Sequence, residues 1–549
     1  MFVEDIKNDF YNVLLGNRVL LIVHYDVDAV CACKILQDLF KCDNISYTLV
    51  PVGGISELKT AYEENNEEIK YVVLVNCGGT IDLVDILQPE EDVVFFVLDS
   101  HKPTDICNVY SDGQVRLVYK DDEENIPNFD DIFRDDEEDE ENDDELQGAD
   151  RLEAVVERRR ARKAWEERRH TLMFNYTQFS YYGKPSACVA LELAVRVSRC
   201  SAAVLWCGAV GCTAHAALYL RPPARCLLDA EPLQRCLAHS TSAHVIVAKD
   251  AWLPLYRWWS VEGALRHAAG LAPRLRLHNS SGATRLRQLL ADMGFPLQQA
   301  RQSYRSMDVE LRRSLLTALE TAAPKHKLTA PTRAAFLLQR PHSHPLAALD
   351  TVYAVMALIE HDTIPKAEGF QKALAALEVC GDNEALKLGI TSARRSLEAV
   401  ARLAQGILAS RGLLLAGPFN YFIVQEGTSE STSVRGPLWL AAAARWVASA
   451  AGGSRPLLAS CPLPDGHCLL LGVPPRYDQE PRKFPAACLL LGVRPRYDQE
   501  PRNLFGAAFE QAAQKSGASV ILDYVDTSVI VLPTSQRTQF LDALTALLA

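Results

Sequence analysis

Short apolar runs alternate with amphipathic segments over the first hundred residues, and this alternation restricts the fold more than any other feature of the chain. The apolar runs are rich in β-branched residues and predict buried strands at 19–24, 45–51, 70–76 and 92–98. The segments between them space apolar residues as helices do, at 29–40, 56–69 and 80–87. Strand–helix alternation of this kind predicts an α/β fold with a parallel sheet covered by helices on both faces.

Polar residues follow three of these strands. Ligands of parallel sheets bind beyond the carboxyl ends of the strands, so we expect these side chains to converge there. They are His24, Asp26, Asp28, Asn76, Asp99, Ser100 and His101.

Two interpretations of these residues compete. A hydrolytic two-metal site needs carboxylates and imidazoles around ions about 3.5–4 Å apart, and the neutral Asn76 stands where a bridging carboxylate would be expected. Alternatively, an aspartate after a strand is often a helix N-cap, and Asp28 suits that role because a helix is predicted to follow it. Polar side chains after three of the strands favour a binding site, although not necessarily a catalytically active one.

Several motifs resemble a known family. HYDVDA (24–29), VNCGG (75–79) and LDSH (98–101) resemble the first three motifs of the DHH phosphoesterase superfamily, which includes the RecJ exonucleases. IDLVDILQPEED (81–92) and LADMGFPLQQ (290–299), with the terminal FLDALTALL, are similar to the cell division control protein 45 family. That family is the RecJ-like component of the CMG replicative helicase, and the resemblance covers nearly the whole chain.

The resemblance implies a degenerate site. Active members of the superfamily carry Asp at the position of Asn76 and a metal-binding His at that of Ser100. We therefore expect no catalytic residue, no cofactor and no dimetal centre, with room for one weakly held ion at Asp26, Asp28 and Asp99.

The resemblance also implies a function. The chain would be a non-catalytic factor of DNA replication initiation and elongation in the nucleus. It would act as a scaffold that joins the MCM helicase ring and the GINS complex, and it would bind single-stranded DNA and replication origins. DNA polymerase and other initiation factors would be further partners. The competing hypotheses are an active metal-dependent RecJ-like exonuclease, or phosphoesterase, and a nucleotide-sensing adaptor.

A length of 549 residues suggests three or four domains. By resemblance, these are a DHH-like α/β domain (1–228), a mainly helical inter-domain region (229–400) and a DHHA1-like α/β domain (401–549). Strands are expected in the last domain at 419–425, 519–524 and 528–533.

Two groups of residues in the later domains could either contact DNA or have a purely structural role. The segment that matches the substrate-binding glycine-rich stretch of active enzymes has a single glycine, Gly506, and leaves three candidate contacts to DNA: Arg482, Arg502 and Asn503. Aromatic side chains can stack on bases, but the cluster in the middle region is interpreted as core. It consists of Trp252, Trp258 and Trp259.

The formal net charge of −12 is unevenly distributed. Residues 121–150 hold 17 acidic residues and one arginine, so the rest of the chain carries about +4 and is compatible with nucleic acid. The acidic stretch predicts a disordered insertion. The run 151–170, with eight Lys and Arg residues, predicts a solvated helix that doubles as a partner surface. Nuclear import and docking to DNA phosphates are the alternatives.

A near-identical repeat lies near the C-terminus. CLLLGVPPRYDQEPR (468–482) recurs at 488–502, differing only at Pro474 and Arg494. Only one copy can occupy a native strand. We expect the second copy to do so, with the first as a loop or an added edge strand.

The fifteen cysteines show no paired metal-binding spacing, and Cys31 and Cys33 lie in a predicted helix, which favours packing. Reduced thiols, no evident signal peptide and no long apolar run predict a soluble intracellular protein without a membrane segment.

Overall fold

The N-terminal part folds around a five-stranded parallel sheet in the order β2-β1-β3-β4-β6. The computed structural model describes the chain except residues 112, 122–123, 135–148, 240–243, 341–343, 380–382 and 476–501. The four predicted strands all form, each within two residues of its expected bounds. The strands are β1 (Val19–His24), β2 (Tyr47–Val52), β3 (Tyr71–Val75), β4 (Val94–Leu98) and β6 (Val115–Leu117).

Helices cover both faces of this sheet because successive strand residues point to opposite sides. Val19, Leu21 and Val23 pack with α2 (Val27–Cys42), while Leu20 and Ile22 pack with the helices of the other face. The first face also carries α9 (Ser186–Arg196) and α10 (Ala202–Ala217); the second carries α3 (Ile55–Asn65) and α4 (Leu83–Leu87). The shorter neighbouring elements are α1 (Asn12–Leu14), β5 (His101–Lys102), α5 (Ile106–Tyr110) and β7 (Tyr181–Tyr182).

The middle region is mostly helical but contains an antiparallel sheet, β10-β9-β8, that helical periodicity did not predict. Its elements are α11 (Pro223–His239), β8 (Val245–Ala251), α12 (Val261–His267), α13 (Gly282–Asp292), α14 (Leu297–Arg301), α15 (Val309–Ala322), β9 (Thr332–Leu338), β10 (Leu346–Ala347), α16 (Ala348–Ile359), α17 (Lys366–Ala376) and α18 (Glu384–Ala409). The three tryptophans are half-buried rather than fully buried, and a guanidinium group covers each ring.

The C-terminal part contains a second five-stranded sheet, in the order β11-β12-β13-β14-β15. Its elements are β11 (Leu414–Ala416), β12 (Phe419–Ile423), α19 (Ser429–Ser433), α20 (Pro437–Ala450), β13 (Leu457–Pro462), β14 (His467–Val473), α22 (Phe505–Ser516), β15 (Val529–Pro533) and α23 (Arg537–Leu548). The strand expected at 519–524 was wrong, because this stretch makes only single bridges, Ile521 with Val531 and Tyr524 with Gly54.

The expectation for the repeat was also wrong. The first copy, not the second, supplies the buried strand β14, which pairs with β13 on one side and β15 on the other. A short turn at 463–466 joins β13 directly to the first copy, so the two form an antiparallel hairpin. Most of the second copy lies outside the described residues.

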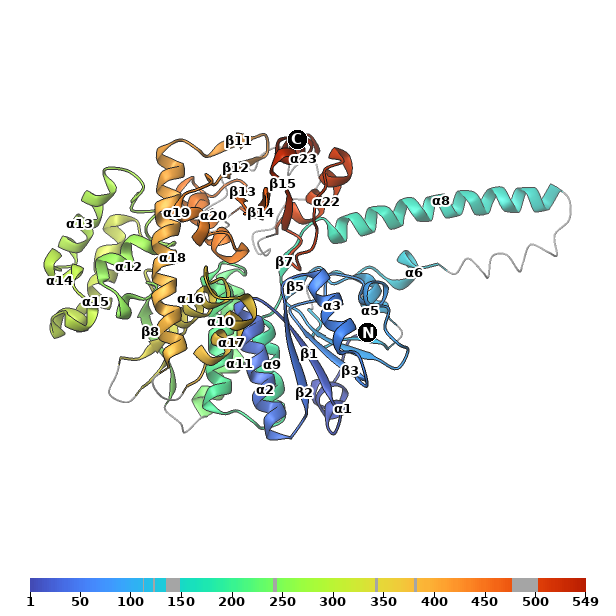
Figure 1. Ribbon diagram of the computed structural model, residues 1–549, viewed down its shortest axis with the longest axis horizontal. Helices are drawn as coiled ribbons and strands as arrows, with labels where there is room; N and C mark the ends of the chain where they lie inside the picture. The colour runs from blue at the N-terminus through green and yellow to red at the C-terminus, as the bar shows by residue number, and fades with distance from the viewer. Residues whose placement is uncertain are drawn as a thin grey trace.

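The acidic insertion is ordered at its base. Glu124 is buried, and its carboxylate accepts bonds from Lys102 Nζ (2.7 Å) and Tyr176 Oη (2.8 Å). A short helix, α6 (Phe129–Ile132), follows. The disorder predicted for all of 121–150 was therefore wrong at 124–134, and residues 135–148 lie outside the described part of the chain. The predicted basic helix forms as part of α8 (Ala149–Thr177), which projects from the body of the molecule (Figure 1).

The largest hydrophobic core runs through the whole chain, from Ile6 to Val529. The expected domain limits fall inside helices, the first within α11 and the second within α18, and the division into domains stays a prediction. Within the described residues, no helix combines the length and the apolar character needed to span a bilayer.

Candidate functional site

The strand-end residues meet at one cleft. Because β1, β3 and β4 are neighbours, the side chains that follow them lie at the same edge of the sheet. The cleft has a volume of about 650 Å³. Six of the seven predicted site residues line it: His24, Asp26, Asp28, Asn76, Ser100 and His101.

Two aspartates occupy different positions at the start of α2. Asp26, in an extended conformation, is the N-cap and accepts a hydrogen bond from Ala29 N (2.7 Å). The N-cap role suggested for Asp28 was therefore wrong, since Asp28 already lies in the first turn. Its carboxylate instead accepts bonds from Ser186 N (2.7 Å) and Ala187 N (3.0 Å), at the start of α9.

Asn76 joins these two carboxylates. Its Nδ2 lies 3.1 Å from Asp26 Oδ2 and 3.1 Å from Asp28 Oδ2 and donates to both. Its Oδ1 accepts a bond from Ser100 N (3.1 Å). A backbone N–H can only donate, so this bond fixes the orientation of the amide. Asn76 has φ of +51°, a left-handed conformation that asparagine tolerates better than most residues.

Each of the three aspartates pairs with a histidine. Nδ1 of His24 lies 3.1 Å from Asp26 Oδ2, and Nδ1 of His101 lies 2.7 Å from Asp99 Oδ1. Nε2 of His215, on α10, lies 3.6 Å from Asp28 Oδ2. Sequence reasoning missed His215; a single histidine in an otherwise apolar helix was the available signal.

These pairs shift the pKa values of the cluster. Burial alone would raise the pKa of Asp26, but the hydrogen bond and charge of His24 outweigh burial and lower this pKa. For His101 the two effects have the opposite signs. Burial alone would lower its pKa, but the charge and hydrogen bond of Asp99 raise this pKa to about 9. At neutral pH the cluster therefore contains Asp26 as an anionic carboxylate and His101 as a protonated imidazole.

The opposite wall comes from later parts of the chain, and none of its residues was among the predicted site residues. Tyr182 follows α8 on β7, pairs with His101 in the strand ladder, and donates its hydroxyl to Asp526 Oδ2 (2.9 Å). Lys366, Arg435 and Arg445 add positive charge along the same cleft.

The three candidate DNA contacts differ in position. Asn503 is buried; its Nδ2 donates to Gly472 O (2.8 Å) and its Oδ1 accepts from Phe505 N (3.2 Å). Arg502 lies over the Tyr181 ring, 5.4 Å from its centroid. Arg482 lies outside the described residues, and the role of all three in DNA contact stays a prediction.

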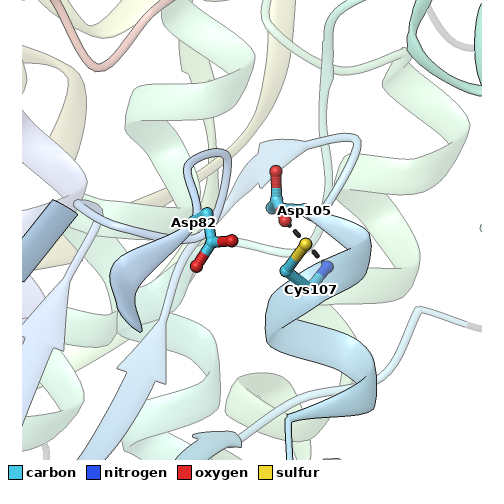
Figure 2. A group of neighbouring side chains, drawn as sticks. All are labelled: Asp82, Asp105 and Cys107. Atoms are coloured by element: carbon cyan, nitrogen blue, oxygen red, sulfur yellow. Dashed lines mark hydrogen bonds between the residues drawn. The ribbon is translucent and has the colours of Figure 1, made fainter. Parts of the chain in front are cut away.

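A second acidic cluster, outside the cleft, has a structural explanation. In the described part of the chain, the ligand-type atoms that converge within 4.8 Å belong to Asp82, Asp105 and Cys107 (Figure 2). Asp82 and Asp105 are the N-caps of α4 and α5. Burial and a hydrogen bond to Asp82 raise the pKa of the Cys107 thiol to about 12, which disfavours the thiolate that binds metals.

Together these features define an α/β protein in which a carboxylate–histidine–amide cluster lies at the carboxyl edge of a parallel sheet. The family model CDC45 matches residues 19–154 and 130–547. The cell division control protein 45 homologs of Mus musculus and Homo sapiens are 36% and 35% identical to the chain, each over its full length and that of the relative. The crystal structure of CDC45 from Entamoeba histolytica covers 100% of both chains with a TM-score of 0.72 at 18% identity, which confirms the fold. The chain belongs to the CDC45 family.

Proposed function

We propose that this chain is a non-catalytic scaffold of the replicative helicase that joins the MCM ring and the GINS complex, and that its cleft holds single-stranded DNA. Membership of the CDC45 family supports a role in DNA replication and in replication complexes, and the relatives are named for cell division control rather than for nuclease activity. The proposed place of action is the nucleus, at origins and forks, beside DNA polymerase and other initiation factors.

The amide of Asn76 is the observation that carries the proposal. A two-ion centre needs negative oxygens that bridge the ions, whereas Asn76 directs hydrogen atoms at both Asp26 and Asp28. A cation between these carboxylates would have to displace that donor. The residues present therefore do not fit a catalytic pair of ions.

Ser100 supports the same conclusion. Its Oγ is buried, and it makes no hydrogen bond within the described residues. A neutral hydroxyl is a poorer ligand for transition-metal ions than the imidazole expected there.

The rest of the cleft carries groups of the kind that contact a nucleic-acid strand. Lys366, Arg435 and Arg445 would attract phosphates at their own positions, although Glu360, Asp362 and Asp526 line the same cleft. Tyr25 and Tyr524 add aromatic rings to its wall. A groove that holds a strand without cutting it would protect the template at a fork.

An active exonuclease is the alternative, because histidines and carboxylates remain in the cleft. The test is hydrolysis of labelled single strands with Mn²⁺, comparing the wild-type chain with the double variant Asp26→Ala and Asp99→Ala. We expect no turnover above the protein-free blank for either protein. Hydrolysis that the double variant abolishes would overturn the scaffold proposal.

Copurification of partner proteins tests the proposed scaffold role. A tagged full-length chain, purified from dividing cells after nuclease treatment, should bring MCM and GINS subunits with it. Their absence, with the tagged chain itself recovered, would contradict the scaffold role.

A further inference from the structure

A short C-terminal segment, residues 523–526, crosses to the N-terminal sheet; we call it the strap. It lies between an exposed stretch, with Ile521 and Leu522 45–47% exposed, and strand β15. Several of its hydrogen bonds are to residues more than 340 positions earlier in the chain.

The strap caps helix α3 from outside. Gly54, the N-cap of α3, has no side chain to accept from the helix N-terminus. Asp523 replaces it: its backbone O accepts from Ile55 N (2.8 Å) and its Oδ1 accepts from Ser56 N (2.6 Å). The strap therefore satisfies N–H groups that a helix start leaves without partners.

Gly54 permits this approach. A Cβ at this position would lie 2.2 Å from Asp523 O, closer than any side-chain carbon can lie to a backbone oxygen. Gly54 has extended backbone dihedrals that other residues adopt as well. Contact with the strap, rather than backbone conformation, requires glycine here.

Two further contacts hold the strap to the first domain. Val525 is 4% exposed and belongs to the hydrophobic cluster beneath α3 and α4. Asp526 accepts a bond from the hydroxyl of Tyr182, and Ser528 orients it through N (2.9 Å) and Oγ (2.7 Å). These contacts lie at the rim of the cleft, where Gly53, Tyr524 and Asp526 line its wall.

We propose that the strap is a latch that controls the entry of single-stranded DNA into the cleft. This inference rests on the proposed function. The strap joins two parts of the chain at the rim of the cleft. Its release would break the contacts with α3 and Tyr182, while the bridge of Ile521 with Val531 keeps the stretch before it on the C-terminal sheet. A strand enters faster when the strap is detached and slower when it is seated.

The test uses the full-length chain with Gly54→Ala, which collides with Asp523 O, and Asp523→Ala, which removes the side-chain cap. Gly406→Ala is the matched control, since a Cβ there meets nothing within 4 Å. Hydrogen exchange reports on the amides of Ile55 and Ser56. Stopped-flow fluorescence with a labelled oligothymidylate reports on strand entry. For Asp523→Ala we expect exchange and association roughly fivefold faster, equivalent to about 1 kcal/mol, with a larger effect for Gly54→Ala and none for the control.

The outcomes separate the two proposals. If the wild-type chain binds the strand and the variants exchange faster without associating faster, the latch is overturned and the DNA-binding function stands. Unchanged exchange in both variants would also overturn the latch. If neither the wild-type chain nor any variant binds the strand, the DNA-binding function fails, and the access role fails with it. If the variants associate with the oligonucleotide faster and their amides also exchange faster, the result supports both the latch and the DNA-binding function.

Discussion

The amide of Asn76 lies where a carboxylate would add negative charge, and its substitution tests the electrostatics of the cleft. Asn76→Asp replaces a donor by a third buried carboxylate beside Asp26 and Asp28. We expect it to destabilise the protein by ~1–3 kcal/mol in metal-free buffer, because like charges meet and two hydrogen bonds are lost. Thermal unfolding in EDTA should show a lower Tm than that of the wild-type chain.

Added Mn²⁺ should raise the Tm of Asn76→Asp more than that of the wild-type chain, because the variant places a carboxylate beside Asp26 and Asp28 where the wild type has an amide donor. An Asn76→Asp protein as stable as the wild type in EDTA would contradict this account of the cluster.

A second residue-scale prediction concerns pH. Asp350 is 1% exposed, and burial raises its pKa to about 7 although the charge of Arg257 opposes the shift. Between the unfolded-state value of 3.8 and about 7, the native state keeps a proton that the unfolded state loses. Stability contributed by Asp350 is therefore complete below pH 3.8 and is lost as the pH rises through about 7.

Asp350→Asn removes this titration while its amide oxygen can still accept the bond from Leu255 N. We expect the Tm of the variant relative to the wild type to increase as the pH rises from about 4 to about 7. Thermal scans across this range provide the measurement, and parallel pH profiles would refute the assignment.

At this scale, residue type was predictable and orientation was not. The sequence showed that polar side chains follow β1, β3 and β4, and six of them line the cleft. That Asn76 donates to two carboxylates depends on the bond from Ser100 N, which belongs to another strand end. The third histidine, His215, arrives from α10 and follows no strand.

At the scale of elements, α8 is held at its C-terminal end by a buried polar network. Tyr176 donates its hydroxyl to Glu124 Oε1 and Thr104 O, both at 2.8 Å, and Glu124 pairs with Lys102. We expect Tyr176→Phe to cost ~1 kcal/mol and to speed hydrogen exchange in the last turn of α8, because buried acceptors lose their donor. Hydrogen-exchange mass spectrometry measures this effect.

Arg162→Ala on the same helix is the control. Arg162 pairs with Glu166 at the surface (3.1 Å), and exposed pairs of this kind contribute little. Equal effects of the two substitutions would show that the network at the base of α8 does not anchor the helix.

Elements with a clear hydrophobic pattern in the sequence were predicted. Segments whose conformation depends on contacts with distant parts of the chain were not. Parallel strands covered on both faces are apolar over nearly their whole length, so β1, β3 and β4 were evident from the sequence. The edge strand β2 was predicted as well, although most of its residues are only half-buried. The stretch 519–524 has strand-like composition, but it leaves the sheet to reach α3. The two copies of the repeat have nearly the same sequence, so their local patterns could not tell which of them forms β14.

At the scale of the whole molecule, the cleft is assembled from residues between His24 and Val529. A parallel sheet predicts one edge of such a cleft, since its strand ends coincide there. It does not predict the opposite wall, because the contacts between Asp523 and α3 join residues 467 positions apart. Local sequence patterns also did not predict that one hydrophobic core would extend across the expected domain limits.

Helix α8 projects from the body of the molecule as a single long arm (Figure 1). At 1.5 Å per residue, its 29 residues extend roughly 40 Å from the anchored end. Exposed basic side chains such as Arg159, Arg160 and Lys163 are therefore carried well away from the two five-stranded sheets that bound the cleft.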